Sequence, residues 1–245
     1  MRLYAVTTPA AGAELVADRL WQAGAAGIWE GDAPGGAVVL RAGVDEADVE
    51  AFLAGVADLS PVDVTDAERV ELATRTVEIG AGGLRATLEV PPTVFGDGLH
   101  PTTAACLELV AARVGPGVRF LDVGCGSGAL SVVAALAGAS VVAIDVDAVA
   151  VEATLGNAAR NGVVLEASTA PLAAVGATFD VVAANISARA VLELAGDLRR
   201  FCAPGGVIVP SGILAERWAE VRSGLGGEVL EVREVDGWVS AVVRP

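Results

Sequence analysis

The chain has 245 residues, of which 53% are hydrophobic and 19% are charged, and this composition excludes an intrinsically disordered protein. Its 16 arginines, with no lysine, stand against 31 acidic residues, and the net charge of −15 argues against binding to a nucleic acid backbone. This acidity suits a basic protein partner, although it is equally explained by a contribution to solubility alone. Three scattered cysteines, Cys106, Cys125 and Cys202, predict neither a metal site nor a disulfide framework. No secretion signal is recognisable near residue 1, so we predict a cytoplasmic protein.

Residues 1–64 predict a small domain of their own. Strands are expected over 2–7, 27–30, 37–41 and 62–64, and helices over 14–23 and 45–57. The order β-α-β-β-α-β is typical of an α+β, ferredoxin-like domain. Because this domain contains no catalytic pattern, we predict that it recognises the substrate; a purely structural appendage is the alternative.

Residues 65–94 are predicted to connect this domain to the rest of the chain. Two strands are expected over 76–79 and 84–90, with glycines in the turn between them and Pro91-Pro92 after them. A hinge between the two domains is expected near residues 62–75.

The segment FGDGLHPTT, which begins at Phe95, leads into the next predicted helix. Its two glycines make a loop, and Pro101 is well placed in the first turn of a helix. Thr103 then lies at a helix start, where free N–H groups and hydroxyls can contact a ligand. His100, the only histidine, is more often structural than catalytic in such a loop; a proton relay through Asp97 or His100 is the alternative.

Strands and helices alternate through residues 95–245. Strands are expected over 118–123, 140–145, 163–167, 179–184 and 206–210, and helices over 128–137 and 148–161. Two further helices are expected from their apolar faces, which are formed by Val191, Leu194, Leu198 and Phe201 in one and by Leu214, Trp218, Val221 and Leu225 in the other. Two further strands, over 228–235 and 238–243, flank Asp236-Gly237, the strongest short hairpin signal. The uncharged run 123–144 is long enough to span a membrane, but its glycines favour a buried strand–helix–strand instead. We therefore predict an α/β fold with a doubly wound, mostly parallel, seven-stranded sheet of the Rossmann type.

The motif LDVGCGSG lies between the first of these strands and the helix that follows it. Gly124, Gly126 and Gly128 allow a tight turn and the close approach of a ligand to the helix start. Asp145 comes 21 residues after Gly124, at the end of the next strand, where a carboxylate can accept hydrogen bonds from a ribose diol. This layout predicts a nucleotide cofactor. The glycine spacing alone also fits a dinucleotide, because an alanine follows the last glycine.

Asp122, two residues before the first glycine, distinguishes between these cofactors. A dinucleotide pyrophosphate would repel a second carboxylate, whereas the ammonium and sulfonium groups of S-adenosylmethionine would be attracted to it. We therefore predict an S-adenosylmethionine site, and methyl transfer rather than hydride transfer. A structural aspartate that only caps the loop is the alternative for Asp122.

The motifs LDVGCGSG and AIDVD and the strand ending in AAN resemble class I S-adenosylmethionine-dependent methyltransferases. Other segments resemble more narrowly the PrmA-type enzymes that methylate ribosomal protein L11: FGDGLHPTT, VEATLGNAARNGV, VVAANIS, APGGVIVPSGIL and DGWVSAVV. Near the start, VADRLWQAGAAGIWE is similar to the small recognition domain of that family. The resemblance implies cofactor contacts at Thr103, Gly124, Asp145 and Asn185, with Ser168 beside the adenine.

The chain departs from the family pattern at three places. Asp97 stands where the family usually has threonine in Gly-Thr-Gly, and Ser187 stands where it has leucine after Asn-Ile. The tryptophan-rich segment that typically joins the two domains is missing. These departures concern substrate handling more than cofactor binding.

An amine must be neutral before it can accept a methyl group. At pH 7 this costs about 4.6 kcal/mol for a lysine with a pKa near 10.4, and about 1 kcal/mol for an α-amine with a pKa near 7.8. A nearby carboxylate would favour the protonated form of the amine. The neutral Asn185 side chain and the Asn185–Ile186 carbonyls are therefore predicted to accept the hydrogen bonds of the amine. We predict methyl transfer to lysine or N-terminal amines, with L11 as the expected substrate, by a monomer that needs no metal, membrane or nucleic acid. A methyltransferase for another protein or a small molecule, and a cofactor-binding module without catalysis, are the alternatives.

Overall fold

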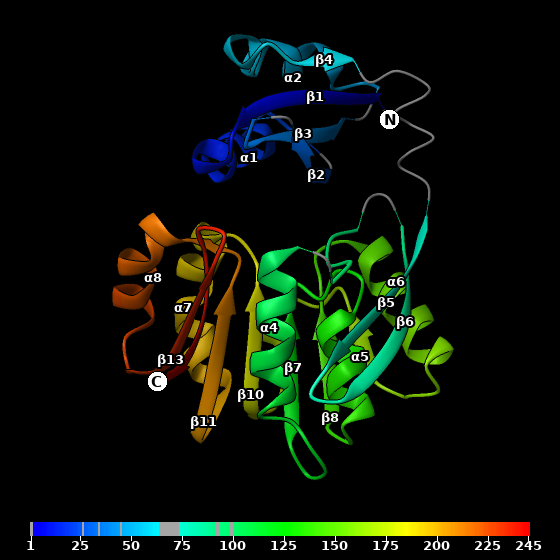
Figure 1. Ribbon diagram of the computed structural model, residues 1–245, viewed down its shortest axis with the longest axis vertical. Helices are drawn as coiled ribbons and strands as arrows, with labels where there is room; N and C mark the ends of the chain where they lie inside the picture. Colours follow the sequence, from blue (N-terminus) through cyan, green and yellow to red (C-terminus); the bar gives the residue numbers. More distant parts are fainter. Residues whose placement is uncertain are drawn as a thin grey trace. The chain divides into compact units, whose positions relative to one another are not determined.

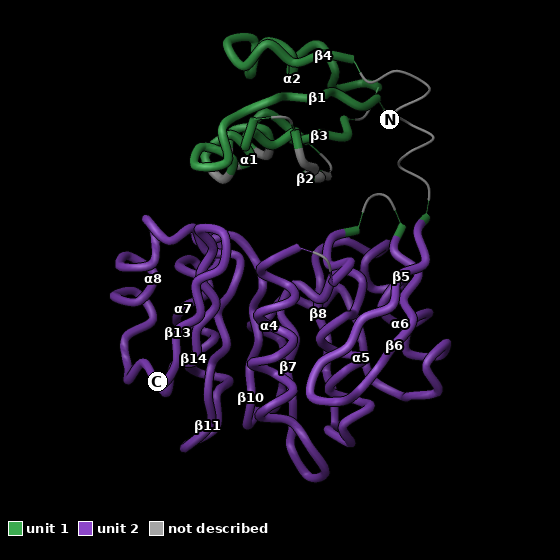
Figure 2. The backbone as a smooth tube through the Cα atoms, viewed as in Figure 1, with its two compact units in different colours: residues 1–74, 91–94 green, residues 75–90, 95–245 purple. Residues whose placement is uncertain are grey.

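The structure, a computed structural model, describes residues 2–25, 27–33, 35–44, 46–63, 74–91, 94–98 and 100–245. They form two compact units (Figure 2): unit 1 takes residues 1–74 and 91–94, and unit 2 takes residues 75–90 and 95–245. The hairpin over 75–90 is therefore part of the same unit as the C-terminal two thirds of the chain. Several predicted features lie outside the described residues: Val64, residues 65–73 of the connector and hinge, Pro92, and Leu99 in FGDGLHPTT.

Unit 1 is a four-stranded antiparallel sheet, in the order β2-β3-β1-β4, with two helices (Figure 1). Its elements are β1 (Arg2–Pro9), α1 (Ala13–Gln22), β2 (Gly27–Ala33), β3 (Ala37–Val44), α2 (Val49–Gly55) and β4 (Val62–Asp63), with 3-10 helices η1 (Ala10–Gly12) and η2 (Ala57–Leu59). The predicted β-α-β-β-α-β, ferredoxin-like order is confirmed. Helix α2 is shorter than the predicted 45–57, because residues 46–48 form turns and residues 57–59 tighten into η2.

The core of unit 1 is formed by one face of its sheet together with its helices. Tyr4 and Val6 of β1 and Leu40 of β3 point to this face, as the period of two in a strand requires. They pack with Leu20 of α1 and Phe52 of α2, and the rings of Tyr4 and Phe52 lie 5.6 Å apart. Unit 1 thus has a hydrophobic core of its own.

Unit 2 contains one eight-stranded sheet, in the order β12-β14-β11-β10-β7-β8-β9, with β13 paired to β14. Its strands are β7 (Arg119–Val123), β8 (Ser140–Ile144), β9 (Glu166–Ser168), β10 (Phe179–Asn185), β11 (Cys202–Ser211), β12 (Ile213–Leu214), β13 (Glu228–Val235) and β14 (Trp238–Arg244). Strands β7 to β11 pair in parallel, and β14 is antiparallel to β11. The predicted doubly wound, mostly parallel sheet is confirmed, and the two-residue β12 adds an eighth strand to the predicted seven.

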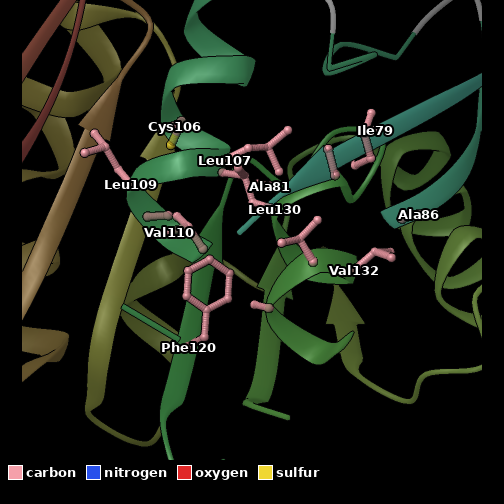
Figure 3. Close-up of a cluster of buried hydrophobic side chains, with 14 of the residues drawn as sticks. Ile79, Ala81, Ala86, Cys106, Leu107, Leu109, Val110, Phe120, Leu130 and Val132 are labelled. Carbon is pink, nitrogen blue, oxygen red and sulfur yellow. The ribbon is translucent and has the colours of Figure 1, made fainter. Parts of the chain in front are cut away.

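Helices cover both faces of this sheet (Figure 1). One face carries α4 (Pro101–Ala111), α5 (Ala129–Leu136) and α6 (Ala148–Arg160), and the other carries α7 (Ala188–Phe201), α8 (Trp218–Leu225) and the 3-10 helix η3 (Leu172–Ala174). A second 3-10 helix, η4 (Ala215–Arg217), leads into α8. Phe120 of β7 packs into the first layer (Figure 3), and its neighbour Leu121 packs into the second. Both side chains are fully buried, and such burial contributes about 2 kcal/mol for each.

The uncharged run 123–144 folds as the end of β7, a loop, α5 and β8, in agreement with the buried strand–helix–strand that was predicted. Within the described ranges, no helix is long and apolar enough to cross a membrane. The start of α6 is also as predicted, because the Asp147 side chain accepts a hydrogen bond from Val149 N at 2.9 Å. Ser187 caps α7 in the same way, with Ala190 N at 3.3 Å.

Two predicted strands begin at the wrong residue. β9 begins at Glu166 rather than at residue 163, because Val163 N donates to Ala158 O and completes the turn that closes α6. β11 begins at Cys202 rather than at residue 206, because Cys202 pairs with Phe179 ahead of a shift in register.

The hairpin of β5 (Arg75–Ala81) and β6 (Leu84–Val90) is held by side chains at the end of α6 and just after it. Asn157 Oδ1 accepts from Glu89 N at 2.7 Å, and its Nδ2 donates to Glu89 O at 2.9 Å. Asn161, one turn later, makes the same pair of bonds with Thr87, at 2.9 and 2.8 Å. Asn157 Nδ2 also donates to Ser127 O at 2.8 Å, so one amide joins the hairpin to the loop before α5.

Candidate functional site

The loop between β7 and α5 is shaped by three glycines with positive φ, at +76° for Gly124, +53° for Gly126 and +80° for Gly128. A Cβ on any of them would lie under 3.0 Å from an atom of another segment of the chain. The obstructing atoms belong to the Ile186 side chain, to the Phe95 carbonyl and to Thr154 of α6, respectively. Glycine is therefore required here both by backbone conformation and by close packing.

The five N–H groups of this loop all have protein acceptors. Those of residues 124 and 125 donate to Ile144 O, at 2.9 and 3.1 Å. Those of residues 126, 127 and 128 donate to Asp145 Oδ2, Phe95 O and Cys125 O, at 2.9, 2.9 and 2.8 Å. Since none of these donors bonds to Asp122, the alternative in which Asp122 caps the loop does not describe this structure.

Asp122 is 1% exposed and lies on the α5 side of the sheet. Its Oδ2 accepts from Ser131 Oγ at 2.6 Å, while its Oδ1 is buried without a hydrogen-bond partner among the described residues. Burial raises the pKa of this carboxyl to about 7; the Ser131 bond opposes the rise, and the charge of Asp145 adds to it. The unpartnered oxygen suits a cationic ligand group with hydrogen-bond donors.

Asp145 follows β8 and is fixed by two backbone N–H groups. Its Oδ2 accepts from Gly126 N at 2.9 Å and its Oδ1 accepts from Asp147 N at 3.0 Å. A carboxylate has about four acceptor positions, so two remain for ligand hydroxyls. Ser168, at the end of β9, is exposed and accepts from Asp145 N through its main-chain oxygen at 3.2 Å.

Asn185, the last residue of β10, contacts the first turn of α4. Its Nδ2 donates to the buried Thr103 Oγ1 at 3.3 Å, and its Oδ1 is buried without a partner in the described parts of the chain. Ile186, the next residue, packs in space between two glycines of other segments. A Cβ on Gly124 would meet its side chain, and a Cβ on Gly212 would meet its carbonyl oxygen. The peptide at Asn185–Ile186 is therefore confined from two sides.

His100 caps α4, which favours the structural role over the catalytic one. Its Nδ1 accepts from Thr102 N at 3.3 Å and lies 2.8 Å from Thr102 Oγ1. Its ring meets Phe95 and Trp238 edge-on, with centroids 5.4 and 5.3 Å apart. Asp97 forms an ion pair with Arg75 at 2.7 Å.

The predicted site residues thus lie together at the carboxyl ends of the parallel strands. Asp122 lies near the end of β7, and Gly124 directly follows that strand. Asp145 follows β8, Ser168 ends β9 and Asn185 ends β10. Doubly wound sheets bind their ligands at this edge. The sequence did not predict several residues that bond to or pack against these positions: Ser131, Thr154, Asn157, Ser211, Gly212 and Ser240. Ser131 could have been recognised from the sequence, because it is a polar residue in the otherwise apolar helix α5.

The chain is similar to proteins of one known family. The family model described as ribosomal protein L11 methyltransferase (PrmA) matches residues 56–245. The protein named ribosomal protein L11 methyltransferase from Desulfosudis oleivorans is 40% identical over 164 residues, which cover 63% of this chain and 54% of the relative. Its namesake from Geobacter sulfurreducens is 47% identical over 137 residues, which cover 56% of this chain and 46% of the relative. The chain therefore spans about half the length of the curated relatives it matches.

Solved structures show the same fold. The ribosomal protein L11 methylase of Lactobacillus delbrueckii subsp. bulgaricus is 28% identical, with a TM-score of 0.57 over 62% of this chain and 80% of that one. A 16S rRNA N2 G1207 methyltransferase from T. thermophilus is 19% identical, with a TM-score of 0.59 over 98% of this chain and 64% of that one, and it supports the fold alone. With a family model that matches most of its length, this chain belongs to the PrmA family of ribosomal protein L11 methyltransferases.

Proposed function

We propose that this chain binds S-adenosylmethionine and methylates amines of ribosomal protein L11, at lysine side chains or the N-terminal α-amine. The observation that carries the proposal is Asn185, whose amide nitrogen is engaged by Thr103 while its buried oxygen has no partner among the described residues. A buried acceptor without a donor is unfavourable, and the N–H of an incoming amine supplies that donor.

The loop after β7 supports the cofactor assignment. Asp122 carries another buried oxygen that has no partner among the residues described, and the ammonium of S-adenosylmethionine brings both positive charge and three donors to it. Asp145 retains acceptor positions for the ribose hydroxyls, and Val146 beside it is 99% exposed and offers an apolar surface to the adenine, near Ser168. S-adenosylmethionine supplies a methyl carbon that its sulfonium activates for in-line displacement.

The residues around the acceptor align a neutral amine. The Asn185 oxygen and the carbonyl groups of the Asn185–Ile186 peptide accept its hydrogens and direct its lone pair, and such alignment is worth about 7–11 kcal/mol. Asp97 is paired with Arg75 and His100 caps α4, so we propose that the amine enters in its neutral form rather than losing a proton to either.

Unit 1 is proposed to recognise the protein substrate. Residues 1–74 contain 13 acidic residues and 4 arginines, a charge balance that attracts a basic protein such as a ribosomal protein. We propose that the chain acts as a cytoplasmic monomer and makes no direct contact with nucleic acid, since the whole chain carries a net charge of −15.

The test is to incubate the purified chain with methyl-labelled S-adenosylmethionine and purified L11, and to locate the label by peptide mass spectrometry. Label on lysine or N-terminal amines of L11, lost with Asn185→Ala, is the expected result. Label only on another protein or a small molecule would replace the substrate in the proposal. Tight cofactor binding without any transfer would make the chain a binding module.

A further inference from the structure

Two consecutive residues of α4 are attached to the ends of two adjacent strands. Asn185 of β10 and Ser211 of β11 are register partners in the parallel sheet. Asn185 Nδ2 donates to Thr103 Oγ1 at 3.3 Å, and Ser211 Oγ donates to Thr102 O at 3.2 Å. The first turn of α4 is therefore fixed at two neighbouring points along the same edge of the sheet.

The second attachment has a defined direction. Ser211 Oγ also lies 2.7 Å from Ser240 Oγ of β14. A hydroxyl has one hydrogen, and that of Ser211 is used on the Thr102 carbonyl, so Ser240 is the donor in this contact. The resulting chain runs from Ser240 to Ser211 to Thr102, and all three residues are at most 1% exposed. Buried hydroxyl networks of this kind hold a unique arrangement only when every member has its partner.

The orientation of Asn185 depends on this turn of α4. Its amide can point its oxygen toward a substrate only while its nitrogen is held by Thr103. Thr103 follows directly after the residue that Ser211 holds. Loss of the Ser211 bond would leave the Thr102 carbonyl with one partner fewer, and the turn that carries Thr103 would then be held to the sheet only through Asn185.

We propose that Ser211, with Ser240 behind it, is a positioning residue for methyl transfer: it fixes the start of α4 so that Thr103 holds the Asn185 amide with its oxygen toward the incoming amine. The expected effect on kcat rests on the proposed function, whereas the expected effect on the Asn185 amide can be observed without methyl transfer. Ser240→Ala should have a weaker effect than Ser211→Ala, because it leaves the Ser211–Thr102 bond in place.

The chain contains three asparagines, at positions 157, 161 and 185, so protein labelled with ¹⁵N-asparagine shows three side-chain amide pairs. The Asn185 pair is identified by its absence from the spectrum of Asn185→Ala. In Ser211→Ala we expect this pair alone to shift and to exchange faster with solvent, while kcat for the amine substrate falls about tenfold and the Kd of the cofactor changes much less. Ser211→Cys, which keeps a weak donor, should restore part of kcat.

Val221→Ala serves as the matched control, because Val221 is fully buried in α8 on the opposite face of the sheet. It should lower the melting temperature without changing the Asn185 signals or kcat. An unchanged Asn185 amide pair in Ser211→Ala, with kcat at the wild-type level, would overturn the inference. If the wild-type chain methylates no amine but the Asn185 pair still shifts in Ser211→Ala, the proposed function fails and the positioning role stands.

Discussion

Protonation of Asp122 should control the affinity for S-adenosylmethionine. Burial raises the pKa of this carboxyl to about 7, so it is mostly neutral at pH 5.5 and about half ionised at pH 7. The ammonium of the cofactor is attracted to the ionised form, so binding should shift the equilibrium toward that form and release a proton. The Kd should therefore fall as the pH rises through this range.

The size of the effect follows from the ionised fraction of Asp122 in the free protein. With a pKa of about 7, that fraction is about 3% at pH 5.5 and about 50% at pH 7, so the affinity should rise about fifteenfold between the two. An α-amine with a pKa near 7.8 stays protonated over this interval, so the cofactor itself contributes little to the slope.

Titration calorimetry between pH 5.5 and 7, in buffers of different ionisation enthalpy, measures both the Kd and the protons released. At pH 6 we expect about 0.9 proton per cofactor bound. Asp122→Asn should bind more weakly at pH 7 and with little pH dependence. Asp180→Asn, at the other end of the parallel strands beside Arg119, should keep the wild-type slope. A Kd that is flat with pH in the wild type, or an equal slope in Asp122→Asn, would refute the assigned contact.

Three further predictions concern the same site. The unliganded protein should lose up to about 4 kcal/mol of unfolding free energy between pH 4 and pH 8, because the pKa of the Asp122 carboxyl is near 3.8 in the unfolded chain and about 7 when it is buried. Urea titrations of the wild type and of Asp122→Asn at each pH measure the contribution of Asp122 to this loss. Asn185→Ala should lower kcat about a hundredfold or more with an unchanged circular dichroism spectrum; wild-type turnover would remove Asn185 from the mechanism. Gly126 has a φ of +53°, and a Cβ there would meet the Phe95 carbonyl oxygen. Gly126→Ala should therefore lower the free energy of unfolding by at least about 1 kcal/mol and weaken cofactor binding. A wild-type melting curve together with a wild-type Kd would contradict this packing argument.

The parts of unit 2 that the sequence predicted well are those with strong local patterns. The apolar run into LDVGCGSG, the glycines and the next apolar run determine β7, the loop and β8 within a short stretch of chain. The start of β9 was misplaced for a local reason as well. Val163, Val164 and Leu165 look like a strand, but Val163 completes the closing turn of α6 and Val164 is left 93% exposed.

The contacts that hold the site could not be read from local patterns, because they join residues far apart in the chain. Ser211 bonds to Thr102 across 109 positions, and Asn157 bonds to Glu89 across 68. Neither pair has a periodic signature, and a serine at a strand end is most often a solvated residue. The need for glycine at position 212 likewise becomes clear only from the structure, in which the backbone of Ile186 lies against it.

Asn157 of α6 and Asn161, which directly follows the helix, also have a consequence for solubility. A strand at the margin of a sheet displays free N–H and C=O groups that another molecule can pair with, and this is a common start of aggregation. Asn157 and Asn161 occupy both groups of Glu89 and of Thr87, so two amide side chains act there as a substitute for a neighbouring strand. These side chains thereby shield the β6 edge of the hairpin from intermolecular β-pairing without adding a strand to the fold.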